Sequence, residues 1–203
     1  MLITVVNNKG GVGKSTTATL LAEFAAQVGM KVGGCDLCPQ QNLIDNLTLN
    51  GESLYDEICP IASPSKTQSK DKLEKFDVVV VDTPPNVNSA AVRNMIEASD
   101  VIVIPMRPEK HAVYGLQEML KLVPERARCV VLCWIPREIG SYEKEFLQIL
   151  RDRLSDYLAE LPMLKRISRN LGLHKLWSYG LRKEEKDVYG KVFSRILGIE
   201  VHE

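Results

Sequence analysis

The sequence has no apolar run long enough to cross a bilayer, no charged amino-terminal segment with a cleavage site, and no repeat or low-complexity tract. A membrane span needs about 20 predominantly apolar residues, and a secretion signal needs a charged segment followed by an apolar one. We therefore expect a cytoplasmic protein. An excess of either charge is also missing, because 26 Lys and Arg balance 26 Asp and Glu. The whole molecule has no net charge with which to hold a polyanion.

The cysteines do not form a recognisable framework. Five is an odd number, and the pair Cys35 and Cys38 is followed neither by a second pair at zinc-ribbon spacing nor by paired histidines. Reduced thiols are the expected state, and a metal or redox pair is not expected. Cys129 and Cys133 lie at even spacing on a predicted strand, so they share one face of it and belong to the core.

Strand and helix patterns alternate along the 203 residues, of which 45% are hydrophobic. Short apolar runs rich in β-branched residues predict strands at residues 2–6, 31–35, 77–81, 101–104 and 129–133. Helical spacing predicts helices at residues 15–28, 90–98, 113–123, 142–158 and 188–197, and residues 59–69 form a predicted surface loop. Continuous apolar strands are typical of a parallel sheet covered on both faces. We expect a single domain, residues 1–203, with a doubly wound α/β fold and a mostly parallel sheet.

A glycine-rich segment, Asn-Lys-Gly-Gly-Val-Gly-Lys-Ser-Thr at residues 8–16, joins the first strand to the first helix. Glycines let backbone N–H groups converge on phosphate oxygens, and the helix adds the positive end of its dipole. Lys14 would reach the β- and γ-phosphates, and the Ser15 hydroxyl would ligate Mg²⁺. The segment predicts a P-loop NTPase fold that binds ATP and Mg²⁺. The candidate nucleotide-binding residues are Lys9, Gly10, Gly11, Val12, Gly13, Lys14, Ser15, Thr16 and Asp82.

Two carboxylates follow neighbouring apolar strands. Asp82 ends a run of four valines and is followed by Thr-Pro-Pro, and Asp36 begins the sequence Asp-Leu-Cys-Pro-Gln-Gln. Ligands of open α/β sheets bind at the carboxyl ends of the strands, so Asp82 is predicted to hold Mg²⁺ through water. Asp36 is the candidate for orienting or deprotonating the attacking water. The candidate metal ligands are Ser15, Asp36 and Asp82, and the candidate catalytic residues are Lys9, Lys14 and Asp36.

These motifs together resemble those of the ParA and MinD families. Residues 9–16 resemble their deviant Walker A loop, residues 82–85 their Walker B and second switch, and residues 36–41 their first switch, Asp-x-Asp-Pro-Gln. The resemblance covers residues 1 to about 135. It is closest to the short ParA class, since the chain begins at the first strand and leaves no room for an amino-terminal helix-turn-helix.

The resemblance implies an ATP-dependent dimerisation switch with slow Mg-ATP hydrolysis. In the family the extra lysine, here Lys9, reaches the partner subunit's nucleotide, so a homodimer is expected in the ATP state. The implied role is plasmid or chromosome partition, or cargo positioning, through non-specific DNA binding, at the nucleoid and with a ParB-like adaptor that stimulates hydrolysis. Cys38 stands where the family usually has a second aspartate. Because a thiol is mostly uncharged at neutral pH, this substitution puts the hydrolysis rate in question.

Two other functions remain open from the sequence. A MinD-like membrane switch could lay the helix at residues 188–197 on anionic lipid, although such apolar spacing is more typical of a helix packed on the sheet. A metabolic enzyme of the dethiobiotin synthetase type uses a related glycine loop, but no substrate motif is recognisable. The candidates for purine-side contacts are Pro136 and Arg137, which follow the fifth predicted strand.

Charge is unevenly distributed between the two halves. Residues 1–100 carry 8 basic and 12 acidic side chains, and residues 101–203 carry 18 basic and 14 acidic ones. A DNA-binding face is therefore expected in the second half. Between residues 165 and 195 only Glu184, Glu185 and Asp187 oppose the basic residues. The predicted basic patch consists of Lys165, Arg166, Arg169, Lys175, Arg182, Lys183, Lys186, Lys191 and Arg195.

Overall fold

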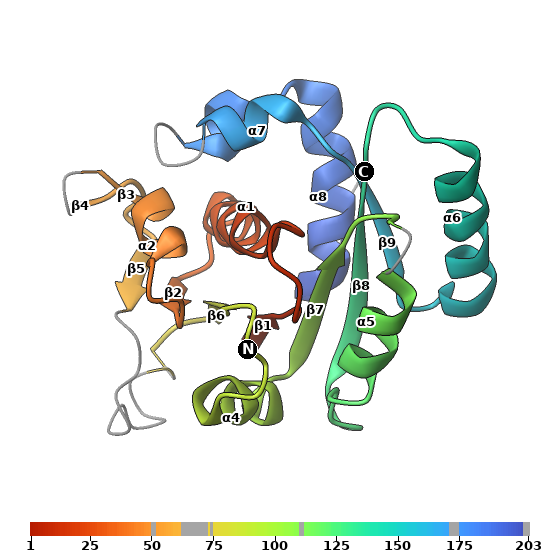
Figure 1. Ribbon diagram of the computed structural model, residues 1–203. Coiled ribbons are helices and arrows are strands. Elements are labelled where there is room, and N and C mark those ends of the chain that lie inside the picture. The colour runs from red at the N-terminus through yellow and green to blue at the C-terminus, as the bar shows by residue number, and fades with distance from the viewer. Residues whose placement is uncertain (50–51, 62–72, 74, 110–111, 171–174, 201–203) are drawn as a thin grey trace.

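A computed structural model shows, among the described residues, one sheet of seven parallel strands. Their order across the sheet is β5-β2-β6-β1-β7-β8-β9. The structure describes residues 1–49, 52–61, 73, 75–109, 112–170 and 175–200. Helices cover both faces of the sheet (Figure 1). The strands are β1 (Leu2–Val5), β2 (Val32–Asp36), β5 (Ile58–Ile61), β6 (Val78–Asp82), β7 (Val101–Met106), β8 (Arg128–Ile135) and β9 (Leu158–Pro162), with a small antiparallel ribbon of β3 (Thr48–Leu49) and β4 (Glu52–Ser53). The helices are α1 (Lys14–Gln27), α2 (Asn42–Leu47), α4 (Ala90–Ala98), α5 (Ala112–Leu120), α6 (Ser141–Leu154), α7 (Lys165–Asn170), the π-helical turn η1 (Leu176–Gly180) and α8 (Lys183–Leu197). The doubly wound α/β prediction is confirmed.

Alternate residues of β8 face two separate cores, because successive side chains point to opposite faces of the sheet. On β8, Val130 and Leu132 belong to the core under α1, α2, α7 and α8. Cys129 and Cys133 belong to the core under α4, α5 and α6, which confirms the even-spacing prediction. Both faces of the central strands are thus buried, and this explains why their sequences are apolar throughout.

Two predicted elements were wrong at the sheet edges. The predicted helix at residues 142–158 ends at Leu154, and Leu158 begins the edge strand β9, which pairs with Val131 of β8. The short turn at residues 155–157 separates a helical apolar pattern from a strand apolar pattern, and the two merge in the sequence. The predicted loop at residues 59–69 starts inside β5, since Cys59 to Ile61 pair with β2. Pro60 masks this strand in the sequence, but an edge strand tolerates proline. Residues 62–69 lie outside the described residues.

The carboxyl-terminal elements cover the helix that follows the glycine loop. Glu23 of α1 is fully buried and accepts backbone N–H groups of Leu176 (3.0 Å) and Trp177 (2.6 Å). Burial raises the pKa of Glu23 to about 7, and these N–H donors act against that rise. Phe24 packs against Trp177 and Phe193, with ring centroids 4.8 and 5.9 Å away. The last helix is therefore held on the core by its apolar face, as the sequence predicted.

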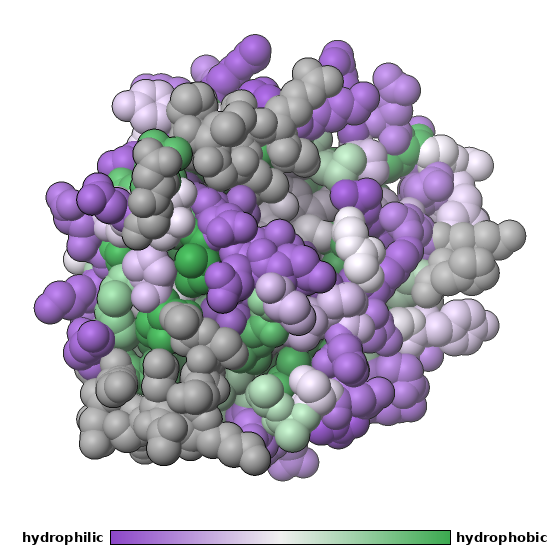
Figure 2. Space-filling model, turned by 60° about the vertical axis from the view of Figure 1, so that its left-hand side comes forward, coloured by the Kyte–Doolittle hydropathy of each residue, from purple (hydrophilic) through white to green (hydrophobic). Residues whose placement is uncertain are grey.

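The surface offers no extended apolar belt in the view of Figure 2, where hydrophilic residues cover most of the face and hydrophobic ones gather in small areas. None of the helices in the described residues combines the length and the apolar character that a membrane crossing would require.

Candidate functional site

The glycine-rich loop connects the carboxyl end of β1 to the first turn of α1. Gly11 and Gly13 have φ values of +73° and +98°, a region that residues with a Cβ rarely adopt. A Cβ on Gly13 would also meet the indole Nε1 of Trp134 at 3.1 Å. Gly13 caps α1 without a side-chain hydrogen bond, so the first N–H groups of the helix remain available to an anion.

Side chains fix this loop to the sheet. The buried Asn7 donates from Nδ2 to the carbonyl of Pro105 (2.9 Å), and its Oδ1 accepts the backbone N–H of Lys9 (2.9 Å). On the other side, Trp134 donates from Nε1 to the hydroxyl of Thr17 (3.2 Å), which itself donates to the carbonyl of Gly13 (2.7 Å). The loop conformation is thus determined before any ligand binds.

The two lysines of the loop have different environments. Lys14 is only 6% exposed, and its Nζ donates to the carbonyl of Lys9 (2.9 Å). Burial lowers the pKa of Lys14, while the charge of Asp82 acts in the opposite direction. Lys9 is about half exposed and forms an ion pair with Glu109, which follows β7. Lys14 is positioned for a ligand inside the loop, and Lys9 can leave its partner at low cost.

The two candidate carboxylates lie opposite each other, because Asp36 and Asp82 are register partners on β2 and β6. Asp36 is 2% exposed. Its Oδ1 accepts the backbone N–H of Cys38, and its Oδ2 accepts that of Leu43, each at 2.7 Å. Asp36 therefore holds the loop between β2 and α2, and in this conformation both of its oxygens are engaged.

Asp82 is fully buried and has a free oxygen. Its Oδ1 has no hydrogen-bond partner among the described residues, and its Oδ2 accepts a weak hydrogen bond from the Cys38 thiol (3.8 Å). Burial raises the pKa of Asp82 to about 6; the Ser15 hydroxyl lowers it, Asp36 raises it, and Lys14 lowers it. An unpartnered buried carboxylate oxygen next to a hydroxyl fits a hard cation that prefers oxygen ligands, such as Mg²⁺.

Cys38 completes this cluster. One ligand atom each from Asp36, Cys38 and Asp82 lies within 4.8 Å of the others. Burial and then the two carboxylates raise the pKa of the Cys38 thiol well above its usual range, so the thiol remains protonated at neutral pH. A neutral thiol fits Mg²⁺ poorly. Cys35 faces the core instead, and burial raises its pKa to about 12, so the two cysteines do not act as a pair.

A cleft of about 300 Å³ adjoins the glycine loop at the carboxyl edge of the sheet. The structure brings most of the predicted loop residues and Cys38 to this cleft. Lys9 and Val12 of the loop do not line it, and neither do the buried Asp36 and Asp82. Gln40 of the first-switch motif and Thr83 of the second-switch motif also line it, although neither was named as a candidate site residue. Arg107 lines it as well, and sequence reasoning missed it, since it belongs to none of the recognised motifs. The full lining consists of Gly10, Gly11, Gly13, Lys14, Ser15, Thr16, Cys38, Gln40, Asn42, Thr83, Pro85 and Arg107.

A second hollow adjoins the loop on the side of α7. Its lining combines loop residues with apolar side chains of the carboxyl-terminal region. Neither Pro136 nor Arg137 lines this hollow. The residues that line the second hollow are Val12, Gly13, Thr16, Arg107, Trp134, Met163, Leu164 and Ile167.

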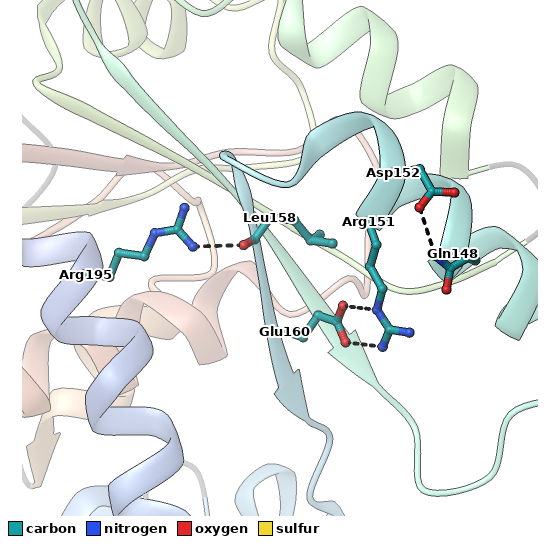
Figure 3. Close-up of polar contacts among 6 residues, drawn as sticks. All are labelled: Gln148, Arg151, Asp152, Leu158, Glu160 and Arg195. Atoms are coloured by element: carbon teal, nitrogen blue, oxygen red, sulfur yellow. Dashed lines mark hydrogen bonds and ion pairs between the residues drawn. The ribbon is translucent and has the colours of Figure 1, made fainter.

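Much of the predicted basic patch is used within the fold. Arg195 donates to the carbonyls of Leu158 (3.1 Å) and Asp156, so it ties α8 to the start of β9, while Arg151 and Glu160 tie α6 to the same strand (Figure 3). Arg166 pairs with Glu185.

Two further patch residues make internal contacts. Lys186 donates to the carbonyl of Ser178 (3.3 Å), and the Nζ of Lys175 lies 4.5 Å from the ring centroid of Tyr55. The side chain of Arg169 lies outside the described residues. The exposed members are Lys165, Arg182, Lys183, Lys191 and Arg195.

A family model described as an AAA domain matches residues 1–74 and 66–128. The chain is 28% identical to the chromosome-partitioning ATPase Soj of Thermus thermophilus over 61% of each chain. It is 34% identical to the maintenance of carboxysome distribution protein A of Gloeobacter kilaueensis over 53% of this chain and 49% of that one. The chain thus spans about half to two thirds of the length of these relatives.

Among solved structures, an ATP complex of McdA from Cyanothece matches with a TM-score of 0.77 and 18% identity, over 100% of this chain and 98% of that one. At this identity the likeness concerns the fold, and it covers the carboxyl-terminal elements that the family model does not reach.

Proposed function

The chain belongs to the AAA domain family as a ParA-type partition ATPase of the ParA/MinD group, and we propose that it is an ATP-dependent dimerisation switch with slow hydrolysis. A partition or positioning ATPase is the function that its relatives share. The observation that carries the proposal is the loop around Gly13, with a buried Lys14 and a start of α1 that no side chain caps. We propose that residues 1–203 form a single P-loop ATPase domain.

Nucleotide would bind with its phosphates in the loop. Backbone N–H groups of residues 10–16 would donate to phosphate oxygens, and Lys14 would exchange the carbonyl of Lys9 for the β- and γ-phosphates. Ser15 and Asp82 would hold Mg²⁺, which offsets charge on the phosphates when bound. The purine would lie toward the hollow next to Trp134 and Met163.

We attribute slow hydrolysis to Cys38, whose side chain lines the cleft in which the phosphates would bind. We do not assign Asp36 to the attacking water, because Asp36 does not line the cleft and each of its oxygens already accepts one backbone N–H. Cys38 lines the cleft instead, and its protonated thiol is a weak base. We propose that Asp36 holds the first switch loop and that a partner protein, similar in role to a ParB adaptor, accelerates the reaction.

Dimerisation would depend on Lys9. Its ion pair with Glu109 is exposed and costs little to break, so the side chain can turn toward the phosphates of a second subunit. That contact would offset charge from the opposite nucleotide.

We propose that the dimer binds DNA without sequence preference. A monomer with the exposed residues Arg182, Lys183 and Lys191 makes few phosphate contacts, and a dimer doubles them. The MinD-like alternative is less favoured, because Phe193 and Ile196 of α8 are fully buried and unavailable to lipid.

The test is sedimentation with ATP, with ADP and without nucleotide, followed by a DNA shift assay under the same conditions. We expect a dimer and a DNA shift with ATP alone, and neither with Lys9→Ala. Changing Arg182, Lys183 and Lys191 to glutamate should abolish the shift and leave the dimer. The matched control reverses Lys121, Lys144 and Arg153, exposed residues outside the patch. A parent protein that stays monomeric with ATP would refute the switch.

A further inference from the structure

Arg107 is the cationic side chain near the glycine loop that none of the recognised motifs includes. It follows directly after β7 and lines the phosphate cleft together with Gly11 and Lys14. It also lines the second hollow together with Gly13 and Thr16. Arg107 therefore stands between the two hollows, at the start of α1.

The guanidinium has an unfilled hydrogen-bonding position. The Nε of Arg107 is buried and has no partner among the described residues. Buried N–H donors in folded proteins are nearly always paired, and an exception calls for an explanation. A phosphate is the acceptor that a planar guanidinium matches best, because two parallel N–H groups can donate to two of its oxygens.

The backbone carries Arg107 rigidly with the loop. The residue two positions earlier, Pro105, accepts the Asn7 side chain (2.9 Å), and Asn7 in turn accepts the N–H of Lys9. The carbonyl of Arg107 accepts the N–H of Glu109 (2.8 Å). The end of β7 is thus fixed to the glycine loop, and a side chain mounted there keeps its distance from a bound phosphate.

We propose that Arg107 is a further phosphate-binding residue, which contacts the α- and β-phosphates of the nucleotide held by its own subunit. Arg107 shares the second hollow, toward which the purine would lie, with Gly13 and Thr16, whereas Lys14 would serve the β- and γ-phosphates. The inference rests on the proposed ATP binding. It adds the Arg107 guanidinium, a cationic group outside the loop motif, to the groups that would bind the phosphates.

The experiment measures the affinities for ATP and ADP of the parent, Arg107→Gln and Arg107→Lys, with the control Arg153→Gln, which changes an exposed arginine of α6. Loss of a hydrogen bond to a charged group corresponds to roughly a tenfold to hundredfold weaker affinity. We expect that loss for Arg107→Gln with both nucleotides alike, a smaller loss for Arg107→Lys, and none for the control. The thermal midpoint without nucleotide should not fall, because no partner of the Nε group is removed.

Three results would overturn the assignment. Unchanged affinities would show that Arg107 does not touch the phosphates. A loss confined to ATP would place it at the γ-phosphate instead. A lower midpoint without nucleotide, with unaltered affinity, would make its role structural. Failure of the proposed function is distinguishable from all three, because the parent protein itself would then bind neither ATP nor ADP.

Discussion

The glycine loop at residues 8–16 and the first switch loop at residues 36–42 both follow a buried strand and lead into a helix, yet they are stabilised differently. The glycine loop has its shape from backbone angles at Gly11 and Gly13 and from the packing of Trp134. The switch loop depends on one carboxylate, Asp36, which accepts the N–H of Cys38 within the loop and that of Leu43 in the following helix α2. A loop whose shape depends on backbone angles, such as the glycine loop, tolerates few substitutions. A loop held by side-chain hydrogen bonds, such as the switch loop, can replace the residue at one position by another of different chemistry and keep its shape. Cys38 is such a position.

Lys14→Ala tests the glycine loop and should have the largest effect. In the parent, ATP at a hundred times its dissociation constant should stabilise the fold by about 2.7 kcal/mol. The variant lacks the buried ammonium group that would pair with the phosphates, so this stabilisation should vanish. Thermal unfolding with and without Mg-ATP measures it, and Lys144→Ala, an exposed lysine of α6, is the control. If Mg-ATP raises the thermal midpoint of Lys14→Ala as much as that of Lys144→Ala, the loop assignment is contradicted.

Asp36→Asn tests the switch loop and should cost about 2 kcal/mol of unfolding free energy, even without nucleotide. An amide keeps one acceptor oxygen but turns an NH₂ group toward the other N–H donor, and an unsatisfied buried donor costs about 1–3 kcal/mol. Denaturant unfolding checks this, with the exposed Asp45→Asn of α2 as control. If stability is unchanged and only hydrolysis falls, Asp36 acts on water after all.

The contrast between local backbone patterns and contacts made in three dimensions also explains which parts of the fold and of the candidate site the sequence predicts. The loop residues, Asp36 and Asp82 were all recognisable, since strand ends and glycines leave local patterns. Strand β9 was hidden, because Leu158 and Leu161 continue a helical spacing from α6. Arg107 at the cleft and Met163 at the second hollow gave no signal, because their places depend on how the end of β7 and the segment before α7 pack against distant parts of the chain. The engagement of both Asp36 oxygens is likewise a matter of three-dimensional structure.

Cys38→Asp sharpens the comparison by restoring a carboxylate at the cleft. The rate of ATP hydrolysis should rise by about tenfold, a modest share of what a positioned base contributes. The unliganded fold should become less stable, because a third carboxylate would join Asp36 and Asp82 within the same cluster. Phosphate release in single-turnover conditions measures the rate, and Cys38→Ser controls for removal of the thiol. A variant that hydrolyses more slowly than the parent would refute the account of Cys38.

Glu109→Gln should have the smallest effect, because it concerns an exposed ion pair. In the unliganded conformation Glu109 holds Lys9, and each exposed pair is worth about 0.2–1 kcal/mol. A dimer in which Lys9 crosses must break two such pairs. Without them the ATP-dependent dimer should therefore form at about fivefold lower protein concentration, while ATP affinity per subunit stays the same. Sedimentation across a concentration series measures this shift. The control is Glu118→Gln, which removes the exposed pair with Lys121 and should leave the dimer unchanged. A weaker dimer in Glu109→Gln would mean that Glu109 assists Lys9 rather than holding it back, and the proposed difference between the fixed backbone of the glycine loop and its exposed first lysine would be wrong.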